Sequence, residues 1–151
     1  MTKIDLKKIK ELREATSAPI MECKKALKIC SADMKKAKAW LKKQGLAKAA
    51  KKKGKATKEG TIYSYIHSGG KVGAMVKLTC QTDFVAKNDE FQRLIREICM
   101  QIAAMKPKNV QKLLAQEYIR DPEKKIEDLL NEAIAKFGEN IKIEEFVRLE
   151  V

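Results

Sequence analysis

Hydrophobic residues change their spacing along the chain, and each change marks a change of predicted secondary structure. Over residues 5–45 they recur every three or four positions, as on one face of a helix, whereas over residues 61–80 they alternate with polar residues, as in strands. Helical spacing returns between residues 89 and 137, and alternation returns after residue 140. This order predicts an α+β protein with a three-helix bundle, followed by an antiparallel three-stranded sheet with helices packed on one face.

The helices predicted for residues 1–46 carry recognisable start and stop signals. Asp33 is suited to cap the third helix, and Pro19 fits the first turn of the second, where its missing N–H costs nothing. Gly45 stands just past the predicted end of the third helix, where a left-handed residue commonly closes a helix. Trp40 is the largest predicted member of the small core that these helices share.

A change of composition separates the bundle from the sheet. Residues 47–60 are rich in lysine, alanine and glycine, and repulsion between like charges disfavours a packed segment. We therefore expect a basic linker at 47–60 between a first domain at 1–46 and a second at 61–151, although its first residues can extend the preceding helix. Such a linker is usually just solvated. The alternative is an RNA contact through phosphates, without the aromatic or arginine side chains that read bases.

A hairpin and a C-terminal strand form the predicted sheet. Gly69-Gly70 joins the first two strands, because both positions tolerate positive φ. We expect Ile62 and Ile66 on the buried face, and Tyr63 and Tyr65 on the opposite one. The alternation also places Val72, Ala74, Val76 and Leu78 on the buried face, keeps Ile141, Ile143, Val147, Leu149 and Val151 in phase on the last strand, and puts Met75 and Phe146 on the second face.

Three helices are predicted between the hairpin and the last strand. The first starts at Asn88, next to two acidic residues that suit a helix N-terminus, and stops at Pro107. A short helical piece is expected at 109–117. Asp121-Pro122 predicts the start of the third helix, which Gly138 closes.

Composition narrows the classes of function. The formal charge of +13 predicts attraction to an acidic protein face, RNA or an anionic membrane, and charge alone does not choose among them. The four cysteines have no C-x-x-C spacing and His67 has no catalytic companion, so we expect free thiols, no metal and no cofactor. The sequence has no motif of a phosphate loop, zinc protease or nucleophile elbow, which argues against an enzyme. Without a membrane-length apolar run or a signal-peptide pattern in Met1–Asp5, we expect a cytoplasmic protein, or the mature form of a matrix or stromal protein, with no membrane contact.

The most distinctive short motif is Thr82-Asp83-Phe84-Val85, which lies where the second predicted strand ends and a predicted helix begins. An aromatic residue on a junction between two rigid elements is well placed to enter a pocket of a partner. The alternative is that Phe84 pins the helix to the sheet, and periodicity alone leaves both interpretations open.

Two longer stretches carry a resemblance. Cys80-Gln-Thr-Asp-Phe-Val-Ala-Lys-Asn-Asp-Glu-Phe91 closely resembles the signature of the bacterial-type elongation factor Ts family, the nucleotide-exchange factors of the GTPase elongation factor Tu. Leu12-Arg-Glu-Ala-Thr-Ser-Ala-Pro-Ile-Met-Glu-Cys-Lys-Lys-Ala-Leu27 is similar to the N-terminal motif of that family, in the same order. The resemblance extends over nearly the whole chain.

The resemblance implies both a fold and a mechanism. The first domain would be a bundle of the ubiquitin-associated (UBA-like) type, and the protein would bind elongation factor Tu and promote release of GDP. It implies that Phe84 wedges between helices of the partner near its magnesium site, while Asp83 supports the junction. It also implies that Ile20, Met21 and Lys24 face the GTPase domain, whereas periodicity alone also allows the first two to lie in the bundle core.

The chain departs from the family pattern in two ways. Ile20 and Pro19 stand where relatives commonly have methionine and glycine. Many relatives also carry an additional helical segment between the regions matching Met105-Lys-Pro107 and Leu113, and this chain passes directly from one to the other. We therefore expect a monomer or a weak homodimer. Two other classes stay open: a bundle that binds ubiquitin-like or peptide ligands, and a protein that binds RNA directly.

Overall fold

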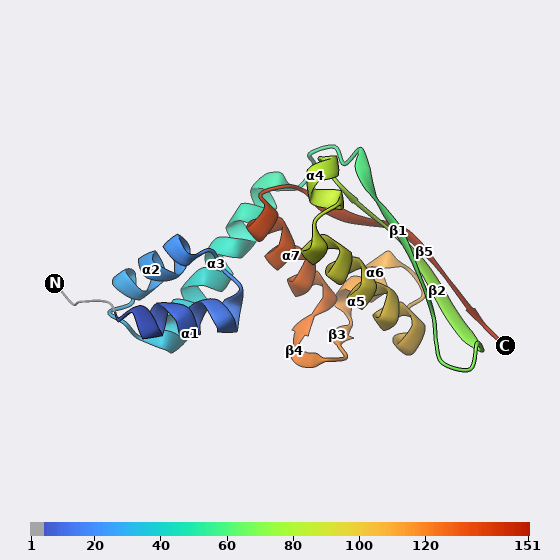
Figure 1. Ribbon diagram of the computed structural model, residues 1–151, viewed down its shortest axis with the longest axis horizontal. Coiled ribbons are helices and arrows are strands. Elements are labelled where there is room, and N and C mark those ends of the chain that lie inside the picture. Colours follow the sequence, from blue (N-terminus) through green and yellow to red (C-terminus); the bar gives the residue numbers. More distant parts are fainter. Residues whose placement is uncertain (1–4) are drawn as a thin grey trace.

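Three helices open the computed structural model, which describes residues 5–151. They are α1 (Leu6–Thr16), α2 (Ile20–Ile29) and α3 (Met34–Lys52), drawn in blue and cyan in Figure 1. The Asp33 carboxylate accepts a hydrogen bond from the backbone N–H of Lys36 at 3.0 Å, so the predicted cap of the third helix is confirmed. Residues 1–4, which belong to the predicted first domain and to the segment tested for a signal peptide, lie outside the described residues.

Aliphatic side chains and one cysteine form the core of this bundle. Its buried members are Ile9, Leu12, Cys23, Ala26, Leu27, Ala37 and Leu41. Trp40 is only partly buried and packs against these residues, with the Lys25 ammonium 5.8 Å from the centroid of its ring. The largest predicted core residue therefore lies at the boundary of the core, where its indole ring also contacts a cation.

The prediction that the third helix ends at Gly45 is wrong, because α3 continues through this residue. Gly45 faces helix α7 (Ile126–Phe137), and a Cβ atom built on it would lie 3.6 Å from Ala135 Cβ. Packing against α7 supports the helix here, and the alanines and lysines that follow are good helix formers. Residues 47–52 of the expected linker are therefore helical, and residues 53–58 connect α3 to the first strand.

Three antiparallel strands form the main sheet, in the order β1-β2-β5. They are β1 (Glu59–Ile66), β2 (Val72–Cys80) and β5 (Ile141–Glu150). Gly69 and Gly70 both have positive φ in the turn between β1 and β2, which confirms the predicted hairpin. The helices of this part lie on one face of the sheet and leave the other face open (Figure 1), as the predicted α+β class requires.

The prediction for the two faces of β1 is wrong. Tyr63 and Tyr65 pair with the buried β2 residues Val76 and Ala74, and they pack against the core beneath the helices. Ile62 and Ile66 point to the open face and are 64% and 66% exposed. Alternation of apolar residues along β1 fits either assignment, because tyrosine and isoleucine can both cover a core. The pairing with β2 decides between them.

A β-bulge reverses the predicted phase of the last strand. The adjacent β2 residues Lys77 and Leu78 pair with Glu145 and Ile143. Glu144 is therefore an extra residue in β5. Before the bulge, the isoleucines are buried as predicted, whereas after it Phe146 packs against the core and Val147 faces away. The predicted position of Phe146 on the second face is therefore wrong. The exposed apolar side chains of the open face are Ile62, Ile66, Met75, Val147 and Leu149.

Four helices and a small hairpin complete the second part. They are α4 (Asp83–Ala86), α5 (Asp89–Met105), α6 (Val110–Ala115) and α7, with β3 (Glu117–Tyr118) and β4 (Asp121–Lys125) forming the hairpin. The predicted short helix at 109–117 is confirmed as α6. The predicted helix start at Asp121-Pro122 is wrong, because these residues lie in β4. The side chain that caps α7 is Asp128, whose Oδ2 accepts a hydrogen bond from Lys125 N at 2.9 Å.

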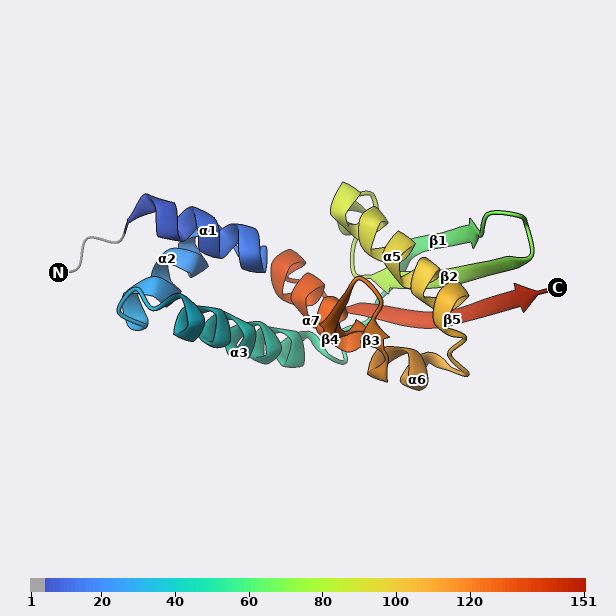
Figure 2. The ribbon, with the colours of Figure 1, turned by 90° about the horizontal axis from the view of Figure 1, so that it is seen from below.

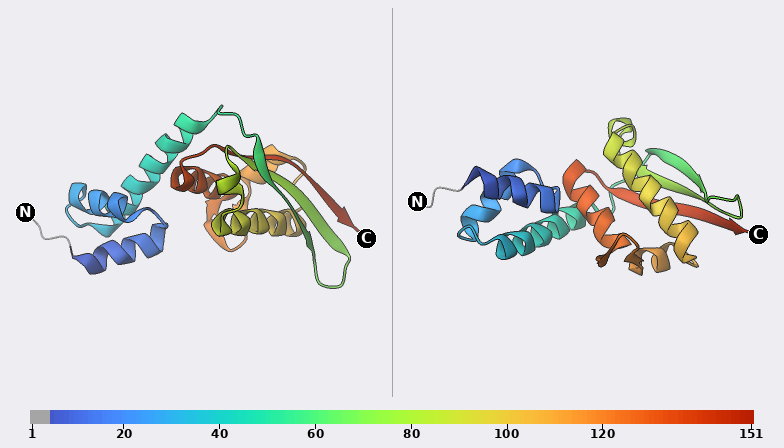
Figure 3. Two further views of the ribbon diagram at one scale, coloured as in Figure 1. Left: turned by 45° about the horizontal axis from the view of Figure 1, so that its top comes forward. Right: turned by 60° about the horizontal axis from the view of Figure 1, so that its bottom comes forward.

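Helix α5 crosses the sheet and provides much of its cover (Figure 2). Its buried face includes Phe91, Ile95, Ile98 and Ile102, as the helical spacing predicts. Helix α3 runs beside α7 and so joins the bundle to the second part (Figure 3). No helix within residues 5–151 is long and apolar enough to cross a lipid bilayer.

Candidate functional site

The motif Thr82-Asp83-Phe84-Val85 forms the turn between β2 and α5, as predicted. Its last three residues begin the single-turn helix α4, and Thr82 is the residue that caps it, with Oγ1 accepting a hydrogen bond from Val85 N at 3.5 Å. The Asp83 carboxylate forms an ion pair with Lys87 one turn later, at 3.0 Å. The motif is therefore held in a fixed local geometry at one end of the sheet (Figure 1).

Phe84 projects into solvent from this turn. It is 84% exposed, more than any other phenylalanine, tyrosine or tryptophan in the described chain. The interpretation that Phe84 pins the helix to the sheet is therefore wrong. Ala86 is buried and Val85 packs against the core, so these two small residues fasten α4 to the body of the protein. An aromatic ring that is this exposed, on a turn anchored to the core, is free to contact another molecule.

A carboxylate from the far end of the chain holds the base of this turn. Glu139 Oε2 accepts hydrogen bonds from Gln81 N at 3.1 Å and Thr82 N at 3.0 Å, and Oε1 accepts one from Thr82 Oγ1 at 2.6 Å. The next residue, Asn140, donates its backbone N–H to Gln81 Oε1 at 2.7 Å. Charge-assisted hydrogen bonds of this kind are stronger than neutral ones, so Glu139 fixes the point at which the chain leaves β2.

Sequence reasoning did not identify Glu139. It follows Gly138, which closes α7 in the left-handed conformation at φ 70°, and it is 57 residues away from Thr82 along the chain. An acidic residue just after a helix-closing glycine is a weak signal, because the fold alone brings it to the end of β2. Only an alignment or a structure can link the two positions.

The charges at the junction suit binding and do not suit covalent chemistry. The hydrogen bond and charge of Lys87 lower the pKa of Asp83, so this carboxylate stays ionised at neutral pH. Burial raises the pKa of the Cys80 thiol to about 11, and its Sγ donates to Thr82 O at 3.1 Å. Cys80 is therefore protonated and unreactive at neutral pH, and it adds one more contact that fixes the turn.

The residues expected to form a second contact lie on α2. Ile20 is 51% exposed and Met21 is 71% exposed, so neither belongs to the bundle core. Lys24 is also exposed and lies one helical turn after Ile20, which puts the three side chains on one face of the helix. The buried positions of α2 are instead Cys23, Ala26 and Leu27.

The two sets of predicted residues are on separate parts of the molecule. Residues 82–85 lie at one end of the sheet, whereas Ile20, Met21 and Lys24 lie in the bundle (Figure 1). Helix α7 connects them indirectly, because it packs against α3 and leads directly into Glu139. A partner that touches both sets must therefore extend along the molecule.

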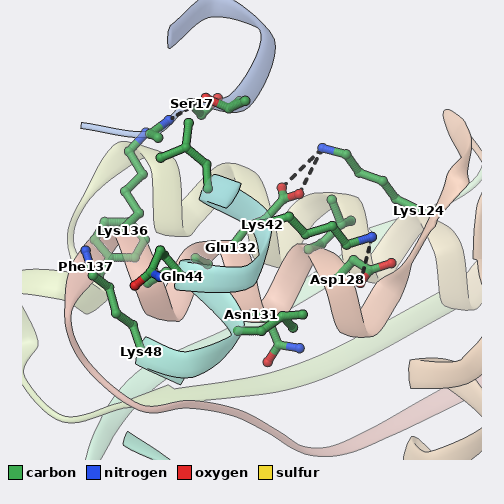
Figure 4. A pocket seen from close by; sticks show the side chains of 18 of the residues that line it. Ser17, Lys42, Gln44, Lys48, Lys124, Asp128, Asn131, Glu132, Lys136 and Phe137 are labelled. Carbon is green, nitrogen blue, oxygen red and sulfur yellow. Dashed lines mark hydrogen bonds and ion pairs between the residues drawn. The ribbon is translucent and has the colours of Figure 1, made fainter. Parts of the chain in front are cut away.

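A groove between the bundle and the second part is lined by ion pairs (Figure 4). Lys124 points toward Glu132 at 3.0 Å, and Lys42 points toward Asp128 at 3.9 Å. These pairs join α3 and β4 to α7, and neither of them includes a histidine, serine or cysteine. Nor do residues 5–151 contain a group of three or more side chains that could hold a metal ion. His67 hydrogen-bonds the Tyr65 hydroxyl at 2.9 Å, as expected for a surface histidine.

A family model and several curated relatives that match this chain carry the same name. A family model described as "Elongation factor TS" matches residues 81–151, which begin at the candidate site. A curated protein named "Elongation factor Ts" from Thermoanaerobacter sp. (strain X514) is 44% identical over 192 residues, covering 97% of this chain and 94% of its own length. Proteins of that name from Oleidesulfovibrio alaskensis and Anaeromyxobacter sp. (strain K) are 41% and 39% identical, covering 100% and 98% of this chain and 99% and 88% of their own lengths.

These relatives are longer than the chain. The match to the Thermoanaerobacter protein extends over 192 positions and the chain has 151 residues, so at least 41 aligned positions have no residue here. The relative therefore has residues within the matched region that this chain lacks, and their place between α5 and α6 stays a prediction. In the structure, residues 106–109 lead directly from α5 to α6, at the place where the sequence predicts the omission.

Proposed function

The chain belongs to the elongation factor Ts family, and from this premise we propose that it is a guanine-nucleotide exchange factor for the translational GTPase elongation factor Tu. In this proposal, the protein binds the GDP form of the GTPase and promotes GDP release by inserting the Asp83-Phe84 region near the magnesium and phosphate site. The observation that carries the proposal is Phe84, an 84% exposed ring on a turn fixed from both sides. The role implies a cytoplasmic location and requires no cofactor.

Exchange catalysis of this kind requires a difference in affinity and no bond-making side chain. The factor must bind the empty GTPase more tightly than the nucleotide-loaded GTPase, and by reciprocity the incoming nucleotide then weakens binding of the factor. A hundredfold difference corresponds to about 2.7 kcal/mol of coupling free energy. The lack of a catalytic group around Phe84 is compatible with this mechanism.

Burial of one aromatic ring is large enough to supply that difference. A phenylalanine that loses about 120 Å² of exposed apolar surface gains about 3 kcal/mol at about 25 cal/mol per Å². Because Glu139 and the pair of Asp83 with Lys87 already fix the turn, little conformational entropy is lost when the ring binds. A single preorganised wedge therefore matches the required free energy.

The exposed face of α2 supports a second contact in this proposal. Ile20 and Met21 offer apolar surface, and Lys24 offers a positive charge to an acidic partner. We assign to these residues the affinity for the GTPase domain, which does not depend on the nucleotide. Phe84 then supplies the part of the binding that competes with the nucleotide.

The test is a Phe84→Ala protein in an assay of fluorescent GDP release from elongation factor Tu. We expect at least a tenfold loss of the stimulated release rate, from a loss of about 1.4 kcal/mol or more of differential binding. The free energy of unfolding should change by less than about 0.5 kcal/mol, because the ring makes few contacts within the protein.

An Ile62→Ala protein is the matched control. Ile62 is 64% exposed, but it lies on the open face of the sheet and is not part of the proposed contact. It should stimulate GDP release like the unaltered protein. Equal rates for the Phe84→Ala protein and the control would refute the wedge, whereas no stimulation by the unaltered protein would refute the exchange function itself.

A further inference from the structure

The net positive charge of the chain comes from its first 60 residues. These contain 19 lysine and arginine residues against six aspartate and glutamate residues, whereas residues 61–151 contain 14 of each. The first part therefore carries the whole formal charge of +13, and the second part is neutral. Such asymmetry within one chain indicates a local surface for a polyanion, because the charge is not spread evenly for solubility.

The charge is concentrated further on the basic segment, residues 34–58. This segment contains eleven lysines and no acidic residue. Its first 19 residues form α3, which is about 28 Å long at about 1.5 Å per residue, and the rest leads to β1. The lysines are Lys35, Lys36, Lys38, Lys42, Lys43, Lys48, Lys51, Lys52, Lys53, Lys55 and Lys58, and all except Lys52 are exposed.

Few of these lysines are neutralised within the protein. Lys36, Lys42 and Lys48 form ion pairs, and the other eight form none with the residues that the structure describes. In the neutral part of the chain, by contrast, seven of the 14 basic residues form ion pairs. Because like charges repel, the basic segment gains nothing for folding from its excess of lysine.

We propose that the basic segment is an RNA-binding surface that contacts the phosphate backbone without reading sequence. Lysine is a flexible point charge that suits phosphate oxygens, and an extended row of such charges matches the regular spacing of phosphates. The segment has no arginine, and its one aromatic residue, Trp40, packs against the bundle core. The segment therefore offers no free aromatic ring for stacking on bases and no guanidinium group for fork-shaped recognition of guanine.

The composition of the segment favours RNA over a protein or a lipid surface. Protein interfaces are enriched in aromatic residues and arginine and depleted of lysine, the opposite of this segment. A helix that lies on a membrane needs an apolar face to insert, but the apolar face of α3 is occupied. Ala37 and Leu41 are buried in the bundle core, and Ala49 is buried in the core of the second part.

The experiment measures binding of the full chain, without its GTPase, to a fluorescently labelled RNA hairpin by anisotropy at a series of salt concentrations. We expect binding at physiological salt and a linear fall of log K with log salt concentration. A Lys43→Gln, Lys51→Gln, Lys53→Gln protein should bind at least tenfold more weakly at physiological salt, and the salt slope should fall by about three. Glutamine has nearly the helix propensity of lysine, so α3 should persist in this variant.

The matched control removes the same charge from the neutral part. Lys71, Lys108 and Lys112 are exposed and form no ion pair with the described residues, so a Lys71→Gln, Lys108→Gln, Lys112→Gln protein should keep its affinity for RNA and its salt slope. Equal losses in the two triple variants would mean that only net charge matters, which overturns the proposal. It is also overturned if the unaltered chain fails to bind RNA at physiological salt, whether or not it binds vesicles that contain phosphatidylglycerol.

Discussion

At the scale of single residues, the candidate site depends on a side chain that does not touch the proposed partner. Glu139 is the acceptor for three donors at the base of the turn, and it is supplied by the end of α7. Without it, two backbone N–H groups lose their partners and the direction of α4 is no longer fixed. We therefore treat Glu139 as a positioning residue for Phe84 within the proposed exchange mechanism.

A Glu139→Ala protein should stimulate GDP release several-fold less than the unaltered protein, even though Phe84 is present. A Glu139→Gln protein should keep most of the rate, because the amide oxygen still accepts from the backbone N–H groups and the amide nitrogen can donate to Thr82 Oγ1. The decisive measurement is a double-mutant cycle. If Glu139 acts by aiming the ring, the Glu139→Ala change has no further effect on exchange once Phe84 is alanine. Additive losses would show a general loss of structure instead.

At the scale of helices and strands, the sequence predicts the features that depend on neighbouring residues, and it does not predict those that depend on tertiary contacts. Asp33 caps its helix as expected, because a cap depends on neighbours three residues away. Gly45 and Asp121-Pro122 were misassigned because packing against α7 and pairing with β3 overrule the usual meaning of these residues. The bulge at Glu144 has no signature in a pattern of alternating residues, so the phase of the last strand could not be predicted.

Because α3 continues through Gly45, the effect of a substitution at this position on stability can be predicted. In a helix interior, a Gly45→Ala change should stabilise the protein by about 0.5–1 kcal/mol, because alanine restricts the unfolded chain and the new methyl group has room beside Ala135. If Gly45 instead ended the helix in the left-handed conformation, the same change would destabilise the protein. Urea denaturation measures the change.

Gly60→Ala is the contrasting control. A Cβ atom at Gly60 would lie 2.8 Å from Thr79 Cα, and closer still to Leu78 O, so backbone must move to admit it. The expected loss is about 1–3 kcal/mol. A lower urea midpoint for the Gly45→Ala protein would contradict a helix that continues through this position.

At the scale of the whole molecule, the sequence predicts candidate site residues but not their geometry. The motif at residues 82–85 was found because two ordered elements flank it, and the structure adds that Phe84 is exposed and that α7 supports the turn. The predicted division into a bundle, a basic linker and a sheet domain stays a prediction. Helix α3 extends past the bundle and packs on α7, so the candidate residues on α2 and the ring on α4 are linked through one framework of helices.

The open face of the sheet bears on oligomeric state. Its five exposed apolar side chains form a surface on which two copies can pair, but Lys77 lies among them and Ser64 separates the two isoleucines of β1. A stable dimer needs about 800 Å² of well-packed surface on each partner, and a charged side chain within the patch loses hydration when it is covered.

We therefore predict that the protein is predominantly a monomer at micromolar concentration and that a weak dimer appears as the concentration rises. Sedimentation velocity over a concentration series measures the two species. A Leu149→Lys protein should lose the dimer, because it places a second lysine on the face where the copies would meet. Lys112→Gln, which changes charge on the helix-covered side, should leave the dimer fraction unchanged. A tight dimer of the unaltered protein at micromolar concentration would contradict the prediction, and would mean that the apolar residues of the open face outweigh the cost of covering Lys77.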